Sequence, residues 1–307
     1  MGIYFRISCH SGCLSIVSRI IIVWRQASGQ VCIRAFRIGN TGFNVFTLQD
    51  ILYIHWTMSH SFPWLRAKVR HLAILNYEID AEVLSPYVPR GVEIDLWEGK
   101  SFVSIVGLLF RQPKIFGIAV PCCQEFEQVN LRFYVRRRTD AGVRRGVVFV
   151  REVVPKRIVA LVARHFFYEN YVCLPMTHNI AFSEPTGKRN TRIEYKWRHH
   201  GRWHGIQIQA GNDAALSEPE SQEAFFIERY WGYTFRPDGL CLEYRFEHPR
   251  WRSQPASAAT FTCDQANIFG PDFGACLFQQ PSSAFISEGS EIRLFPPRAL
   301  QREKYTG

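Results

Sequence analysis

Regular alternation of apolar and polar positions begins at about Lys68 and continues through most of the remaining chain. Short alternating or wholly apolar runs bounded by Gly, Pro and Asp are typical of antiparallel strands. The pattern predicts strands over 68–79, 92–97, 101–110, 129–137, 146–154, 171–182, 192–197, 204–210, 234–235, 240–246 and 284–294. We expect 92–97 to pair with 101–110 as one hairpin, and 129–137 to pair with 146–154 as another. The intervening 112–123 reads as a loop.

Helical periodicity is confined to three short segments, over 81–87, 155–168 and 219–230. Asp80 is a suitable N-cap for the first of them, and Pro155 occupies the first turn of the second. Ser217 and Glu220 have the spacing of a capping box before the third. Many short strands, few helices and no alternation of strand with helix indicate an α+β fold that is mainly antiparallel β. No repeat or linker interrupts 58–307, which favours a single domain.

The first 57 residues differ from the rest, because the segment 1–36 has no sustained helical or alternating period. Their longest apolar run, Ile20 to Trp24, lies between two arginines and is far shorter than the ~20 residues that cross a bilayer. A signal peptide would carry its charges before the apolar stretch. We expect 1–57 to be either an over-extended gene start, with the natural start at Met58, or a poorly ordered natural extension.

The cysteines and the charge limit the class of protein. Nine cysteines, an odd number without C-x-x-C spacing, argue against a disulfide framework and a zinc site, which favours a reduced cytoplasmic location. Net charge is +10, of which 1–57 carry +4 and the rest +6. The densest basic stretch, at 136–138 and 144–145, brackets an Asp-Ala-Gly turn and reads as a solvated hairpin tip. We therefore expect no specific nucleic-acid partner and no membrane partner.

Several strings, in order, resemble one known family. They are RHLAILNYEIDAEVLSPYVPRGVEIDLW, EFEQVNLRFYV, GVVFVREVVPKRIVALVARHFFYENYVCLPM, FFIERYWGY and EHPRW. This run of motifs, over about 66–297, is similar to the YqjF-like bacterial proteins. They form a family of unknown function in the acetoacetate decarboxylase-like superfamily. The resemblance implies a cone- or barrel-like antiparallel sheet around a central cavity, with a few short helices. It brings no known substrate.

The resemblance to acetoacetate decarboxylase itself implies three catalytic candidates. Lys156 falls where that enzyme has its Schiff-base lysine, Arg157 where it has a second lysine, and Arg70 where it has an active-site arginine. A lysine attacks a carbonyl only as the free amine, so its pKa must fall from ~10.4. Arg157 and the helix N-terminus both favour the neutral amine. Arg70 would hold a substrate carboxylate. A solvated pair in the first turn of a helix is the ordinary alternative.

The candidate substrate-binding residues depart from the enzyme. Its two active-site carboxylates correspond to Ser104 and Gln128 here, which places decarboxylation in doubt. Glu127 would face away from a cavity that Gln128 faces, unless a bulge intervenes. Asn130 and Arg132 are polar residues in an apolar string, and either line the cavity or are satisfied core groups.

A basic surface for nucleic acid or anionic lipid is one open hypothesis, and it would need the arginines at 136–138 and 144–145 to share a face with others. Two further hypotheses concern a small molecule. The first is an enzyme, resembling an acetoacetate decarboxylase-like lyase, that uses Lys156 on a small keto or carboxylic compound. The second is a protein that binds a small, mostly apolar acid without chemistry. Neither requires a cofactor or a metal, since 199–204 with its three histidines reads as a surface turn. A homo-oligomer is compatible with both.

Overall fold

The computed structural model describes 62–120, 123–183, 190–211, 214–263 and 268–300, together with the backbone of three strands within 19–47. The chain divides into two compact units, Met1–Phe62 and Pro63–Gly307. The described part of the first unit is an antiparallel sheet of β1 (Arg19–Ala27), β2 (Gln30–Gly39) and β3 (Gly42–Thr47). Met58 lies outside the described residues. The expectation that the natural chain begins there stays a prediction.

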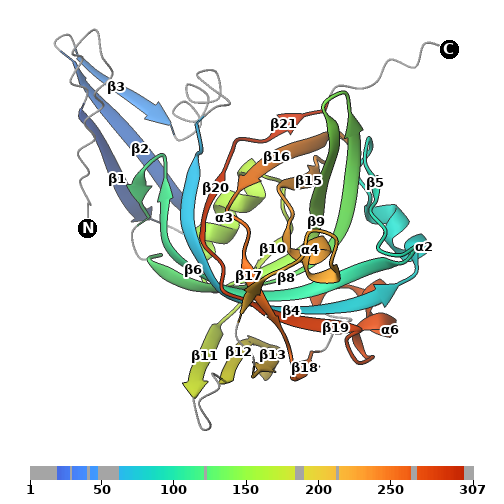
Figure 1. Ribbon diagram of the computed structural model, residues 1–307. Coiled ribbons are helices and arrows are strands. Elements are labelled where there is room, and N and C mark those ends of the chain that lie inside the picture. Colours follow the sequence, from blue (N-terminus) through green and yellow to red (C-terminus); the bar gives the residue numbers. More distant parts are fainter. Residues whose placement is uncertain are drawn as a thin grey trace. The chain divides into compact units, whose positions relative to one another are not determined.

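The second unit is built on a strongly curved sheet whose ends meet. Following hydrogen-bonded neighbours, the order is β4-β20-β16-β15-β9-β8-β6, and β6 then pairs with β4 to close a ring. The bounds are β4 (Leu65–Ile79), β6 (Ser101–Ile115), β8 (Glu125–Thr139), β9 (Gly142–Val154), β15 (Trp231–Phe235), β16 (Cys241–Glu247) and β20 (Glu291–Leu294). Figure 1 shows these strands wrapping around a common interior. All neighbours in the ring are antiparallel except β15 and β9. The prediction of a mainly antiparallel α+β fold around a central cavity is confirmed.

Shorter strands extend the ring at its edges. They are β5 (Glu93–Ile94), β7 (Ile118–Ala119), β10 (Tyr171–Cys173), β14 (Ala215–Leu216), β17 (Arg252–Pro255), β19 (Ser283–Ser287) and β21 (Arg298–Ala299). Three expectations were wrong in detail. β5 pairs with β8 instead of β6, and of the predicted hairpin only the tight turn forms, closed by an antiparallel bridge between Trp97 and Lys100. The expected loop 112–123 carries the end of β6 and β7. The last predicted strand is two strands, β19 and β20, separated by a turn in which Gly289 has φ of +71°.

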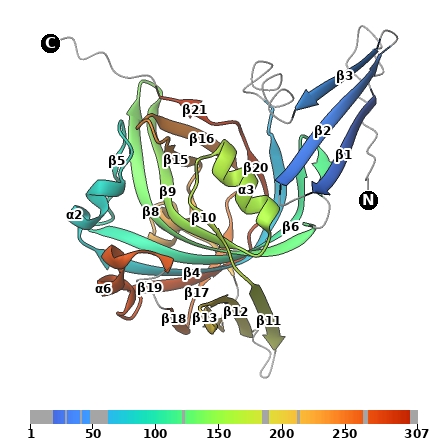
Figure 2. The same cartoon turned by 180° about the vertical axis from the view of Figure 1, so that it is seen from behind.

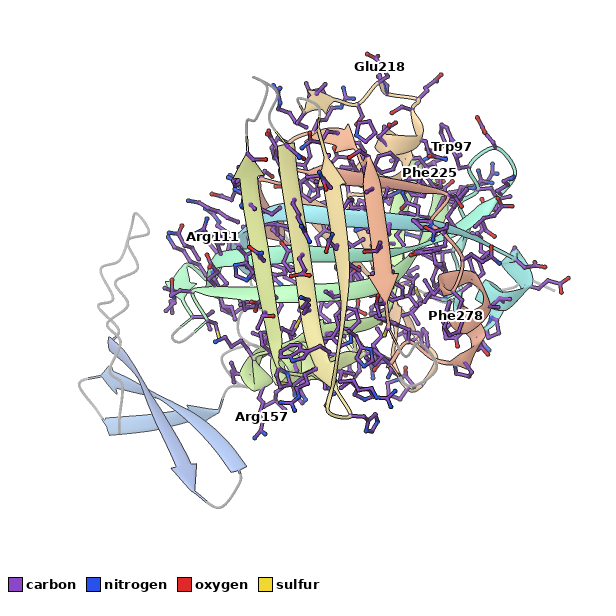
Figure 3. The ribbon with its side chains drawn as sticks, turned by 90° about the horizontal axis from the view of Figure 1, so that it is seen from below. Trp97, Arg111, Arg157, Glu218, Phe225 and Phe278 are labelled. Atoms are coloured by element: carbon purple, nitrogen blue, oxygen red, sulfur yellow. The ribbon has the colours of Figure 1, made fainter. Side chains whose placement is uncertain are left out.

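A second, four-stranded sheet packs on the outside of the ring. It consists of β11 (Met176–Ser183), β12 (Asn190–His199), β13 (Arg202–Ala210) and β18 (Ala258–Thr262) in that order. Figure 3 shows its strands running crosswise to those of the ring. Close approach requires a glycine on β6, because a Cβ at Gly107 would lie 2.4 Å from Ile206 and 2.5 Å from Tyr195. The Tyr195 hydroxyl also donates a 2.8 Å hydrogen bond to the carbonyl of His71 on β4.

The helices are short. They are α2 (Ala81–Leu84), η1 (Ser85–Tyr87), α3 (Arg157–Phe166), α4 (Gln222–Ile227), η2 (Pro271–Phe273) and α6 (Gly274–Leu277). Asp80 caps α2 as expected, whereas α4 is capped by Ser221 instead of Ser217. Figure 2 shows α3 beside β10 at the ring. This helix carries apolar residues on the side that faces the interior, and thereby brings the segment after Lys156 to the candidate site.

Candidate functional site

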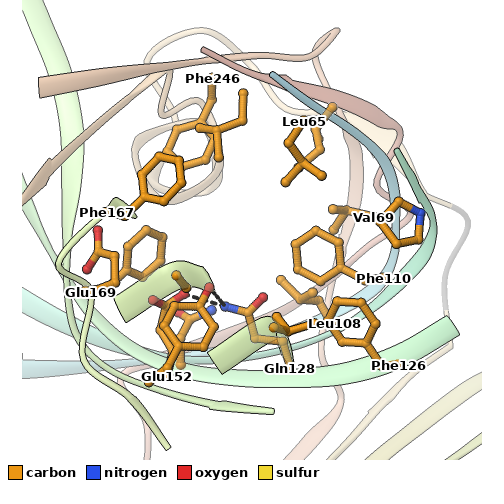
Figure 4. A pocket seen from close by; sticks show the side chains of 18 of the residues that line it. Leu65, Val69, Leu108, Phe110, Phe126, Gln128, Glu152, Phe167, Glu169 and Phe246 are labelled. Carbon is orange, nitrogen blue, oxygen red and sulfur yellow. Dashed lines mark hydrogen bonds between the residues drawn. The ribbon is translucent and has the colours of Figure 1, made fainter. Parts of the chain in front are cut away.

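A cavity of about 230 Å³ lies inside the ring of strands (Figure 4). Its walls are mainly apolar, and α3 contributes one of them through Ile158, Val159, Val162 and Ala163. The other apolar walls include Leu65, Val69, Leu108, Phe110, Phe126, Phe167 and Phe246. A cavity of about 150 Å³ lined by such residues holds benzene. This interior therefore has room for a small organic molecule with a substantial apolar body.

One strand supplies a row of polar side chains to this apolar interior. Gln128, Asn130 and Arg132 occupy alternate positions of β8, and all three line the cavity. Alternate residues of a strand share a face, which accounts for the row. Asn130 lies directly opposite Glu152 of β9, and a bulge between Leu131 and Arg132 shifts the register beyond that point. Gln128 and Asn130 are buried, and Arg132 is half-buried.

Two buried carboxyl groups, those of Glu152 and Glu169, also line the cavity. The Gln128 amide donates a hydrogen bond to Oε1 of Glu152, and the Tyr244 hydroxyl donates one to Oε1 of Glu169. Gln128 Nε2 also lies 3.4 Å from the hydroxyl of Tyr171. Oε2 of Glu152 is buried and has no hydrogen-bond partner within the described part of the chain. These contacting groups, the amide and the two phenols, are all uncharged.

The buried, uncharged environment of Glu152 and Glu169 determines their protonation state. Burial raises the pKa of Glu169 to about 8, although the hydrogen bond from Tyr244 acts in the opposite direction. Burial, with Glu169 as a neighbouring like charge, raises the pKa of Glu152 well above its usual value. A carboxyl removed from water without a cationic partner holds its proton. At neutral pH at least one of the two groups is therefore neutral.

The cationic side of the cavity is formed by two arginines in different situations. Arg229 is fully buried, and its Nη1 lies 2.5 Å from Oδ2 of Asp95. Arg132 instead donates from Nη2 to the backbone carbonyl of Phe226 at 3.1 Å, and its guanidinium lies 5.7 Å from the ring centre of Tyr134. Among the described residues it forms no ion pair with a carboxylate, and its buried Nε has no hydrogen-bond partner. The charge of Arg132 is thus uncompensated at the cavity wall.

His248 lines the cavity on the same side but adds no charge. Its ring stacks between Tyr230, at 4.8 Å between centroids, and Trp251, at 4.2 Å. Burial lowers the pKa of His248 below its ordinary value. The neutral imidazole and its aromatic neighbours therefore form a further uncharged wall. On this side of the cavity, Arg229 is paired with Asp95 and Arg132 has no carboxylate partner among the described residues.

The structure places the three catalytic candidates outside the lining of the cavity. Lys156 is the N-cap residue of α3, is half-buried, and precedes the lining residue Ile158 by two positions. Arg157 begins α3 and is exposed. Arg70 donates from Nη1 to the carbonyl of Gly289 at 2.6 Å and is likewise not among the lining residues. Their catalytic roles stay predictions.

The substrate-binding candidates divide into two groups. Gln128, with Asn130 and Arg132, lines the cavity as described above. Ser104 is buried on β6, but its hydroxyl contacts Asn76 at 2.5 Å and Tyr134 at 2.6 Å, away from the lining. Glu127 lies on the opposite face of β8 from Gln128, where it contacts Nδ1 of His178 at 2.7 Å. No bulge reverses this orientation. The ligand-binding roles of these five residues stay predictions.

The basic hairpin tip between β8 and β9 is extensively paired with acids. Arg136 and Arg138 contact Glu93, Arg137 and Arg144 contact Glu243, and Arg145 lies 3.6 Å from Asp95. Much of the positive charge of this stretch is therefore balanced locally.

The histidine cluster is only partly at the surface. His204 was expected in a surface turn, but it is buried and stacks on Trp197 with ring centroids 6.2 Å apart. In the described part of the chain no group of three or more His, Cys, Asp or Glu side chains is arranged to hold a metal ion. No helix in those same ranges is long and apolar enough to cross a membrane.

Sequence reasoning missed the two acids that distinguish this cavity. Glu152 follows Arg151 in Val-Phe-Val-Arg-Glu-Val-Val, and strict alternation from the lining residues Val147 and Phe149 would have turned Arg151 inward instead. The bulge at Val150 reverses this phase, because Leu131 pairs with Arg151 and Arg132 pairs with Phe149. The local pattern therefore gave no signal that Glu152 faces the cavity. Glu169 follows α3 in an irregular segment, and no periodicity assigns its direction. The pairing of the two arises only because Glu152 N bonds to Asn170 O and β10 runs parallel to β9.

Solved structures with the same architecture define the class of fold. The chain is similar to acetoacetate decarboxylase from Legionella pneumophila, with 10% identity, a TM-score of 0.55 and coverage of 78% of this chain and 88% of that one. It is similar to the enduracididine biosynthesis enzyme MppR in complex with pyruvate, with 12% identity, a TM-score of 0.55 and coverage of 86% and 98%. At such identities the likeness establishes an acetoacetate decarboxylase-like fold and nothing about chemistry.

Within that fold class, a family model identifies the chain more closely. Residues 66–291 match the DUF2071 family, described as an uncharacterized conserved protein, and the chain belongs to this family. A relative is the uncharacterized protein YqjF of Bacillus subtilis (strain 168), which is 24% identical over 215 residues, covering 69% of this chain and 75% of that protein. The resemblance noted in the sequence is confirmed.

Proposed function

We propose that the cavity binds a small, mostly apolar carboxylic compound whose carboxylate contacts Arg132. The observation that carries the proposal is the uncompensated guanidinium of Arg132 at the wall of an otherwise apolar interior. A cation partly removed from water is stabilised by an anionic partner, and arginine presents donors that suit a carboxylate. Apolar walls, including those from α3, would bury the body of the ligand.

The acid groups support the same orientation of the ligand. A carboxylate placed beside Glu152 and Glu169 would require one more negative charge where burial already disfavours charge. We therefore expect the carboxylate of the ligand to lie next to Arg132, away from Glu152 and Glu169. MppR, which shares the fold, has been solved in complex with pyruvate, itself a small carboxylic compound.

The test is binding of a series of aliphatic carboxylates, with pentanoate and hexanoate as probes, followed by thermal shift and calorimetry. Arg132→Gln should abolish binding while the chain stays folded. Arg138→Gln is the matched control, because Arg138 lies on the same strand, is 73% exposed and contacts Glu93 outside the cavity. Equal binding by wild type and Arg132→Gln would contradict the role of Arg132. Absence of binding to any member of the series would contradict the proposal.

The second candidate is Schiff-base chemistry through Lys156, assisted by Arg157 and Arg70. It is favoured by the position of Lys156 at the start of the helix that forms one wall of the cavity. Lys156 and the cavity would have to approach one another for the amine to reach a carbonyl. Incubation with β-keto acids and borohydride, followed by measurement of the intact mass, tests this candidate. A covalent adduct that is lost in Lys156→Ala would support an enzyme. If no adduct forms, the non-catalytic binding protein is the remaining candidate.

Cytoplasmic location and homo-oligomer formation stay predictions.

A further inference from the structure

Two buried carboxyls on the wall of a ligand cavity can act on a ligand together. Glu152 projects from β9 and Glu169 from the segment between α3 and β10. Both line the cavity, and the two carboxyls influence each other electrostatically. We propose that Glu152 and Glu169 form a proton-sharing pair that enolises a carbonyl group of the bound ligand, without a covalent intermediate. The inference rests on the proposed binding of a carboxylic compound at Arg132.

The immediate partners fit proton transfer better than structural support. Gln128 from β8 and Tyr244 from β16 each donate to one oxygen of one carboxyl, and Tyr171 from β10 lies against Glu152. These are the groups that face the pair, and all are uncharged. A structural buried carboxylate is normally paired with a cation or fully hydrogen-bonded. Oε2 of Glu152 is buried and has no hydrogen-bond partner among the described residues, so the protein leaves this carboxyl incompletely satisfied.

The register of the ring places the pair at a useful distance from the carboxylate site. Glu152 lies opposite Asn130, and Arg132 is two residues further along the same face of β8. Two residues of a strand span roughly 7 Å. A ligand with its carboxylate at Arg132 would thus carry its carbonyl several atoms away, as in a γ- or δ-oxo acid. Asn130, whose buried Oδ1 also has no partner in the described residues, lies between the two ends.

The proposed step conserves atoms and charge. The protonated carboxyl donates its proton to the carbonyl oxygen, while the ionised carboxylate removes a proton from the adjacent carbon. A C–H bond breaks, an O–H bond forms, and the C=O becomes a C–O single bond next to a new C=C bond. The pair still holds one proton, with the two roles exchanged, and the reverse step restores the ketone. No oxidant, reductant or second substrate is required.

The experiment measures exchange of α-protons of 4-oxopentanoate and 5-oxohexanoate with D₂O by proton NMR, in parallel with their binding. Wild type should accelerate exchange, and Glu152→Gln and Glu169→Gln should each reduce it by at least ~100-fold, the lower range for a general acid or base. Both substitutions are nearly isosteric and remove a buried acid, so the chain should stay folded. Glu→Gln variants that bind 5-oxohexanoate but exchange slowly would separate catalysis from binding.

Two further readouts distinguish the carboxyl pair from a Schiff-base lysine. Borohydride added during exchange should trap no adduct of the oxo acid on the chain, because the proposed step forms no covalent intermediate, whereas a Schiff base on a lysine would be reduced to a stable adduct. The rate in wild type should rise as the pH approaches about 8, the pKa of Glu169, because ionisation of that carboxyl supplies the base. A trapped adduct, with exchange unaffected in Glu152→Gln and Glu169→Gln, overturns the inference in favour of a Schiff base. Binding without accelerated exchange overturns it while the proposed binding function stands. Absence of both binding and exchange overturns the binding function as well.

Discussion

Gln128 and Glu152 are joined by a hydrogen bond from Nε2 to Oε1 between two neighbouring strands of the ring, inside an apolar cavity. A neutral amide satisfies one oxygen of the acid but supplies no charge to balance it. The acid therefore keeps a high pKa. The contact places a polar, proton-holding group in the mainly apolar wall of the cavity, which is the environment that the proposed enolisation requires.

The stability of the protein should fall as the pH rises. The pKa of Glu169 is about 8 in the folded chain and ordinarily 4.5, so the folded state binds the extra proton. Its contribution is complete below about pH 4.5 and is lost as the pH rises through about 8, with a slope of up to about 1.4 kcal/mol per pH unit. Urea unfolding at a series of pH values between these limits should show the loss.

Glu169→Gln should flatten that dependence and make the protein more stable at pH 8 than wild type. Glu220→Gln, an exposed site, is the control and should leave the slope unchanged. An identical slope in wild type and Glu169→Gln would mean that Glu169 is ionised in the folded state.

Asp95→Asn should destabilise the second unit severely. Asp95 is fully buried and its carboxylate lies 2.5 Å from Nη1 of the buried Arg229. Removing one member of a buried pair leaves the other charge unpaired, at a cost of about 3–5 kcal/mol. The free energy of unfolding in urea measures it. Glu93→Gln removes only exposed ion pairs and should leave the unfolding midpoint unchanged. A small effect of Asp95→Asn would show that water reaches Arg229.

Gly107→Ala should weaken the contact between the ring and the four-stranded sheet. The added methyl group would lie 2.4 Å from Ile206 and 2.5 Å from Tyr195, so one or both must move. Overpacking of this kind costs about 1–3 kcal/mol. Gly211→Ala meets nothing within 4 Å and serves as the control. Equal stability of the two variants would indicate that the sheets separate without penalty.

A chain that begins at Met58 should keep the thermal midpoint of the full chain to within a few degrees. The expectation rests on the lack of a sustained period in 1–36, on the regular patterning after Met58, and on the division of the chain into two compact units. Calorimetry of the two chains measures it. A substantially lower midpoint for the shorter chain would make the first unit a necessary part of the fold.

Alternation along single strands made much of the site predictable. The row Gln128, Asn130 and Arg132 follows from the pattern of β8 alone, and the outward position of Glu127 follows with it. Pairing between distant segments did not follow from sequence. The turn-like 98–100 suggested that β5 would fold back on β6, but β5 pairs with β8. Residues that lie beside Glu152 across such pairings, above all Glu169, had no local signal.

Closure of the ring also imposes an order of assembly. One edge of β4 pairs with β6, a near neighbour in sequence. The other edge pairs with β19 and β20, which are synthesised last. Asn76 and Ser283, which meet there through a 3.1 Å hydrogen bond, are 207 positions apart. During synthesis, the strand that opens the ring therefore presents unpaired backbone groups until 283–294 have been made. Contacts so distant in sequence slow folding, and an unpaired edge invites aggregation. A nascent chain arrested before 283 should be the aggregation-prone species, because the ring closes only after the last strands have docked.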